Sequence, residues 1–150
     1  MRIRSFRDRH GRGVRGPLFP RQVPRYRTRS QRFDALVLDA YAPLYRRYAQ
    51  QLGNLDIAVD LVPRMRLHGI EFFTDEVFAD GQVPLGRVIP AGIDAKGNPT
   101  RPRIVLFRTP IEQRSRTLEE RQNLIHTALV ALLATHLNIA PHDIDPGYQW

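Results

Sequence analysis

The side chains best suited to bind a metal are three histidines in the last third of the sequence, His126, His136 and His142. On a continuous helix, the spacing of His126 and His136 means about 15 Å of axial rise and about 80° of rotation, so they cannot chelate one ion. A turn at Pro141 would bring His136 and His142 near Asp143. Hydrogen-bonded side chains around a helix end are the simpler interpretation, and His126 is interpreted as a hydrogen-bonded histidine at the edge of the core. The sequence therefore predicts no metal site, and these histidines are its remaining candidates.

Other catalytic patterns are incomplete. There is no cysteine, which excludes disulfides, thiolate zinc sites and cysteine nucleophiles. Gly11, Gly13 and Gly16 have the G-x-G-x-x-G spacing, but no strand precedes them and no helix starts at the last one, so they predict no dinucleotide site. Glu119 and Glu120 are explained by the favourable effect of acidic side chains at a helix N-terminus. These patterns therefore predict no catalytic residue.

Residues 1–29 form a strongly basic arm. They hold ten arginines and one acid, Asp8, a net charge of +9, whereas the other 121 residues carry 13 basic and 14 acidic groups. Few residues in this segment can pack a core, so we expect an extended or disordered arm that contacts RNA or an acidic protein surface. A solubilising tail without a partner is the alternative. The arginines are Arg2, Arg4, Arg7, Arg9, Arg12, Arg15, Arg21, Arg25, Arg27 and Arg29.

The first elements after the arm are a helix and a strand. Apolar residues recur at steps of three and four from Phe33 to Leu52, which predicts an amphipathic helix with Ser30 as N-cap and an end near Gly53. Pro43 lies inside this helix and predicts a kink. The alternation over 55–61 then predicts a half-buried strand.

The second half of the chain is predicted to supply the core. Val83–Ile89 is expected to be an edge strand, because Pro84 is poorly tolerated inside a sheet. The apolar run Ile104–Phe107 predicts a buried strand after a turn-rich stretch over 94–99. A capping box at Thr117 opens a second helix, which keeps its apolar period up to Asn138. The tail over 143–150 should turn back over the domain.

Several stretches of the sequence resemble the minimal zincin-like metallopeptidases of bacteria. They are Ser30–Ala40, Ile57–Asp60, Pro84–Arg87 and Arg103–Ile111, and the run Arg7–Pro17 is similar to the actinobacterial branch of that family. The resemblance implies an α+β fold in which two principal helices pack on a small mixed sheet. It also implies two parts, the arm over 1–29 and a zincin-like domain over 30–150.

The zinc motif of that family is missing from the sequence. Such enzymes place His-Glu-x-x-His on their last helix, with two imidazoles to bind zinc and a carboxylate to deprotonate the bound water. The register set by matching 137–139 to the Phe-Gly-Ile of the family puts Ala131, Leu132 and Thr135 at these positions. The register set by His126 gives one ligand and no glutamate. We therefore expect no cofactor, and we expect Leu129, Leu132 and Leu133 to be buried against the first helix and the 104–107 strand.

The leading functional expectation is a catalytically inactive, pseudo-zincin scaffold or binding protein whose arm contacts an acidic partner. One alternative is a metal-dependent peptidase, with zinc as its cofactor, that has a non-standard site near His126, His136 and His142. Another is an RNA- or ribosome-associated factor that acts through the arm. The sequence has neither a secretory signal nor about twenty uninterrupted apolar residues, so we expect a cytoplasmic protein without a membrane span. It predicts no oligomeric state.

Overall fold

The structure, a computed structural model, describes residues 27–63 and 76–150. The predicted arm lies outside the described residues up to position 26, and only Arg27 and Arg29 of its arginines are described, both exposed. Residues Phe33–Trp150 form one compact unit. In the described part of the chain, no helix is both long enough and apolar enough to cross a membrane.

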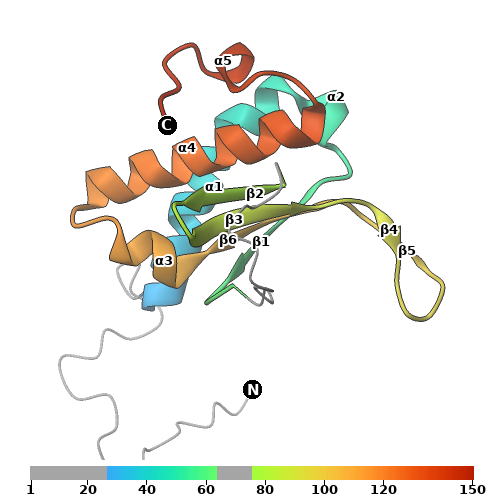
Figure 1. The fold of residues 1–150 in the computed structure, drawn as a ribbon, viewed down its shortest axis with the longest axis horizontal. Coiled ribbons are helices and arrows are strands. Elements are labelled where there is room, and N and C mark those ends of the chain that lie inside the picture. Colours follow the sequence, from blue (N-terminus) through green and yellow to red (C-terminus); the bar gives the residue numbers. More distant parts are fainter. Residues whose placement is uncertain (1–26, 64–75) are drawn as a thin grey trace, which may run out of the picture. The chain divides into compact units, whose positions relative to one another are not determined.

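The centre of this unit is a four-stranded mixed sheet with the strand order β1-β6-β3-β2 (Figure 1). Strand β1 pairs with β6 in parallel, and β3 pairs antiparallel with both β6 and β2. A separate hairpin, β4–β5, encloses the predicted turn over 94–99. The described strands are β1 (Asp56–Asp60), β2 (Val77–Asp80), β3 (Val83–Ile89), β4 (Gly92–Ile93), β5 (Pro99–Thr100) and β6 (Arg103–Phe107).

Two long helices and three short ones accompany the sheet, so the predicted α+β class with two principal helices is confirmed. The sequence predicted neither of the short helices after β6, which have six and four residues and are too short to show a period. The described helices are α1 (Arg29–Arg47), α2 (Ala49–Leu52), α3 (Arg108–Gln113), α4 (Leu118–Leu137) and α5 (Pro141–Ile144).

The first helix differs from its prediction at both ends. The predicted N-cap Ser30 is wrong, because a capping box forms two residues earlier. The Thr28 hydroxyl accepts a hydrogen bond from the Gln31 backbone N–H at 3.1 Å, and the Gln31 side chain accepts one from the Thr28 N–H at 2.9 Å. The predicted single helix up to Gly53 is also wrong, because the chain leaves helical geometry at Tyr48, with φ −119° and ψ 30°. Helix α2 continues after this break.

The prediction that Val83–Ile89 is an edge strand is wrong, because β3 lies between β6 and β2. The pairing with β6 runs only from Gly86 to Ile89 and does not reach Pro84. On its other side, Pro84 faces Ala79 where a β-bulge interrupts the β2–β3 register. The missing N–H of Pro84 therefore breaks no regular ladder, and the proline is compatible with a central strand.

Helix α4 is the central helix of the core. The capping box predicted at its start is confirmed, because the Thr117 hydroxyl accepts from the Glu120 N–H at 3.1 Å and the Glu120 carboxylate accepts from the Thr117 N–H. Asn138 ends the helix in the left-handed conformation, with φ 56°. The predicted burial of three leucines is confirmed. The buried residues of α4 are Ile125, Ala128, Leu129, Val130, Leu132, Leu133 and Ala134.

The core joins α4 to α1 and to the sheet. Phe33 and Val37 of α1 belong to the same buried cluster as the α4 leucines and as Ile104 and Leu106 of β6. Beyond α5, the predicted return of the tail is confirmed, because the Trp150 ring lies against Phe78 of β2 with ring centroids 4.6 Å apart.

Candidate functional site

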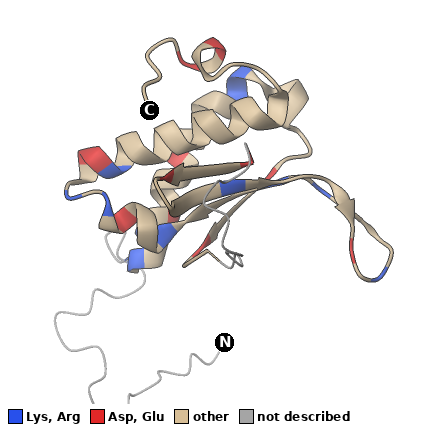
Figure 2. Ribbon diagram, in the orientation of Figure 1, with Lys and Arg blue, Asp and Glu red and all other residues tan. Residues whose placement is uncertain are grey.

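The face of α4 that would carry a zinc motif is filled with ordinary packing. Leu132 has no exposed surface, and a Cβ built on Gly86 of β3 would lie 2.8 Å from its Cδ1 atom. Ala131 and Thr135 are half-buried, and the Thr135 hydroxyl donates a hydrogen bond to the Ala131 carbonyl at 3.2 Å. After Arg121 the helix has no charged residue up to its end (Figure 2).

These residues do not fit a catalytic zinc ion. Such a site needs about three protein ligands and keeps one position open for water. Ala131 and Leu132 have no donor atom, and the hydroxyl of Thr135 is used within the helix. Nowhere in residues 27–63 and 76–150 does a group of three or more histidine, aspartate or glutamate side chains come together in a way that could hold a metal.

The three candidate histidines make different contacts. Nε2 of His126 lies 3.0 Å from Oδ2 of Asp145. His142 meets Tyr148 edge to face, with ring centroids 5.6 Å apart and an interplanar angle of 85°. Burial lowers the pKa of His136, on the last turn of α4, which favours its neutral form. The structure therefore does not assemble these histidines into one site.

The His126–Asp145 pair was not predicted from the sequence. Asp145 also belongs to a turn before Pro146, in which its Oδ1 atom accepts a hydrogen bond from the Gly147 N–H at 3.0 Å. Its second oxygen reaches back to α4 because the chain reverses after Asn138. A carboxylate that accepts from a histidine fixes the tautomer of the ring.

The tail is also fixed to α1. Arg47 donates from Nη1 to the Ile144 carbonyl at 2.7 Å and from Nη2 to the Asp143 carbonyl at 3.2 Å. Ile144 itself is buried. Helix α5 is therefore held by α1 on one side and, through Asp145, by α4 on the other.

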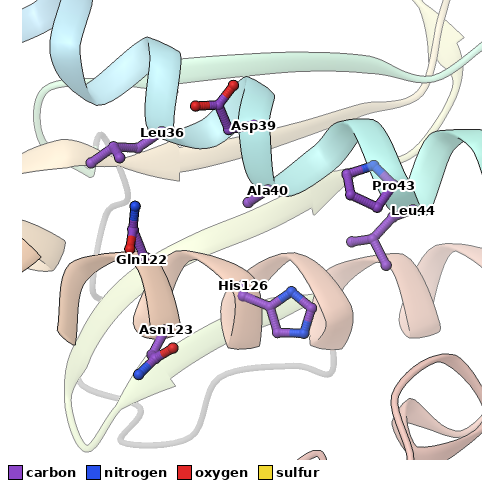
Figure 3. Close-up of a pocket in the computed structure, with 8 residues that line it drawn as sticks. All are labelled: Leu36, Asp39, Ala40, Pro43, Leu44, Gln122, Asn123 and His126. Carbon is purple, nitrogen blue, oxygen red and sulfur yellow. The ribbon is translucent and has the colours of Figure 1, made fainter. Parts of the chain in front are cut away.

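A pocket of about 320 Å³ lies between α1 and α4 next to this pair. The α1 wall is mostly apolar, and Figure 3 shows Ala40 and Leu44 directed toward α4. The α4 wall is polar. The Gln122 side chain rises toward α1, and the His126 ring also lines the pocket (Figure 3). The site thus combines an apolar wall, a side-chain amide and a histidine held by a carboxylate.

We expect Asp145→Asn to lower the stability of the fold at neutral pH and to have little effect in acid. The hydrogen bond from His126, followed by that from the Gly147 N–H, lowers the pKa of Asp145 below its usual 3.8. A carboxylate whose pKa is lower in the folded state stabilises the fold above its unfolded pKa, and this contribution is lost as the pH falls through the folded pKa. Denaturant unfolding of both proteins from pH 7 to pH 2 measures the difference.

The control for this experiment is a double-mutant cycle. His126→Ala alone should cause a similar loss at pH 7, and the double variant should lose less than the sum of the two single losses. A difference between Asp145→Asn and the wild type that stays constant down to pH 2 would contradict the prediction.

The mixed sheet and the buried helix α4 define an α+β domain, and α4 has Ala131, Leu132 and Thr135 at the positions assigned to a zinc motif from the sequence. The family model for zincin-like metallopeptidases matches residues 52–150, about two thirds of the chain. The chain therefore belongs to the zincin-like metallopeptidase family, as the resemblance implied. The match includes every strand that the structure describes, α4 and the tail. No curated protein sequence is similar enough to count as a match.

Proposed function

We propose that this zincin-like protein acts by binding a partner and not by zinc-dependent peptide hydrolysis. The observation that supports the proposal is the packing of Leu132. In the register that aligns the end of α4 with the family, Leu132 stands where an active enzyme has its glutamate base. It is fully buried in the core, against the strands that carry Gly86 and Leu106. A carboxylate at this position would be buried without a partner.

The contact with the partner is assigned to the basic arm over 1–29. The charge division supports this assignment, because the arm has a net charge of +9 and the rest of the chain about −1. An acidic protein surface is the partner that we propose. RNA is the second candidate, because guanidinium groups can contact its phosphates and the aromatic residues between them can stack on its bases. A cytoplasmic location is part of the same proposal and is supported by the absence of cysteine.

We expect the full-length protein to retain well under one zinc ion per chain. The test is elemental analysis after incubation with zinc and dialysis against a weak chelator, together with a peptidase assay on unstructured protein. One zinc per chain that is lost in His126→Ala or His136→Ala would overturn the proposal, and peptidase activity of the zinc-bound protein would establish the non-standard site instead.

We expect the arm to dominate binding to polyanions. A full-length variant with glutamine in place of the eight arginines between Arg2 and Arg25 keeps the chain length and the cap at Thr28. It should bind polyglutamate at least tenfold more weakly than the wild type at low salt, and only the wild type should show a steep salt dependence. Equal affinities would remove the arm from the proposal. A wild-type preference for single-stranded RNA over polyglutamate of equal charge would replace the acidic protein by RNA.

A further inference from the structure

The pocket between α1 and α4 presents hydrogen-bond acceptors to a ligand. Because its pKa is lowered, Asp145 is ionised at neutral pH and can only accept hydrogen bonds. The hydrogen bond to the Asp145 carboxylate, at 3.0 Å, places a ring proton on Nε2 of His126, and the tautomer with its one proton there has a lone pair on Nδ1. Nδ1 makes no hydrogen bond with any residue that the structure describes.

Two further acceptors belong to the same pocket. Gln122 lines it, is exposed and has an amide oxygen that no described residue uses. On the α1 side, Pro43 has no N–H, so the carbonyl of Asp39, four residues earlier, does not receive the helical hydrogen bond that it would otherwise accept from position 43. Asp39 is also the one charged residue among the described residues that line the pocket. These acceptors, together with the charge of Asp39, therefore favour a cation.

The apolar wall of the pocket favours a ligand that also has a hydrocarbon part. Leu36, Ala40 and Leu44 line the pocket from α1, and the buried Leu44 extends this wall into the core. The volume of about 320 Å³ is at the lower end of the range for ligand pockets, so the ligand must be small. A hydrated inorganic cation would leave the hydrocarbon wall without a contact.

We propose that this pocket binds a primary ammonium group on a short hydrocarbon chain, with the chain against Leu36, Ala40 and Leu44 and the ammonium group near Gln122 and His126. The three N–H donors of an ammonium group match the three acceptors at Nδ1 of His126, Oε1 of Gln122 and the Asp39 carbonyl. Both a free alkylamine and the side chain of a lysine have this chemistry. The inference is independent of whether the protein binds zinc.

The experiment compares three probes with the same six-carbon chain on the full-length protein, namely hexylamine, hexanol and hexanoate. Binding is followed at pH 7.5 by the NMR signals of the Gln122 side-chain amide and the His126 ring. We expect hexylamine to bind at least tenfold more tightly than hexanol, and hexanoate not to bind. Equal binding of hexylamine and hexanol, preferred binding of hexanoate, or no shift with any probe would each overturn the proposal.

Matched variants locate the site. Asp39→Asn should weaken hexylamine binding about fivefold, whereas Asp34→Asn, an exposed aspartate of α1 that does not line the pocket, should leave it unchanged. Ala40→Leu should abolish binding by filling the apolar wall. Asp34→Asn could instead weaken binding as much as Asp39→Asn does. The protein would then bind the amine by general charge attraction, and this result would contradict the proposal.

A capped lysine distinguishes the two sources of the ligand. If N-acetyl-lysine N-methylamide binds as tightly as hexylamine, the pocket accepts a lysine side chain of a peptide. If only hexylamine binds, the ligand is a free amine. Both results support the ammonium chemistry, and they differ in the molecule that supplies it.

Discussion

Leu132→Ala is expected to lower the free energy of unfolding by about 2 to 5 kcal/mol, the usual cost of removing a leucine side chain from a core. The residue is fully buried, packs on β3 at Gly86 and shares the buried core cluster with Leu106 of β6. Denaturant unfolding at neutral pH measures the loss. Leu118→Ala is the matched control, because Leu118 begins the same helix and is 60% exposed, so its cost should stay within about 0.5 kcal/mol.

Rebuilding the family motif should be more damaging than this single truncation. The triple variant Ala131→His, Leu132→Glu and Thr135→His places a carboxylate without a partner where Leu132 is now buried. We expect the triple variant to be less stable than Leu132→Ala. A triple variant with wild-type stability would show that this face of α4 opens to solvent, and the proposal of a function without zinc would lose its support.

Gly86→Ala is expected to destabilise the protein by about 1 to 3 kcal/mol through overpacking. A Cβ at this position would lie 2.8 Å from Cδ1 of Leu132 and 3.0 Å from both Cδ2 of Leu106 and the carbonyl oxygen of Val105. The carbonyl belongs to the neighbouring strand and cannot move aside without disturbing the sheet. Thermal and denaturant unfolding provide the measurement.

A double-mutant cycle shows whether the contact with Leu132 is the cause. In a Leu132→Ala background the 2.8 Å contact is gone, so Gly86→Ala should cost less than it does in the wild type. Gly92→Ala serves as the control, because the nearest atom to its Cβ would be the Thr100 hydroxyl oxygen at 3.8 Å, an ordinary contact. Strictly additive effects of the two core substitutions would mean that Leu132 is not what excludes a side chain at position 86.

The parts of the fold that the sequence predicts are those with a long local signal. Helix α4 has a capping box at Thr117 and an apolar period that continues to Leu137, and both were confirmed. The central place of β3 was not predictable in the same way. The place of β3 depends on which of its residues pair with β6. Only Gly86 to Ile89 do so, and Pro84 lies outside this pairing. The sequence of β3 alone does not contain this information.

In the candidate site, too, the sequence predicts the local features and not the contacts between distant residues. The sequence contains no His-Glu-x-x-His, and this can be read without the structure. The pair of His126 and Asp145 joins residues on two elements separated by the left-handed turn at Asn138. The pocket depends on which residues of α1 and α4 face each other, and the spacing within neither helix contains that information. The sequence therefore predicts correctly that His126 is a hydrogen-bonded histidine at the edge of the core. It predicts neither its partner nor its neighbours.

The parallel pairing of β1 with β6 has a consequence for the order of folding. Ile57 pairs with Ile104, so β1 has no strand partner in this pair until the later strand has been synthesised and brought alongside it. The bond from Arg47 to the Ile144 carbonyl spans 97 positions and requires a still longer loop to close. The β2–β3 hairpin and α4 are local structures and can form first. We therefore expect the N-terminal third of the domain to dock last, and a newly made chain to expose its first strand during that interval.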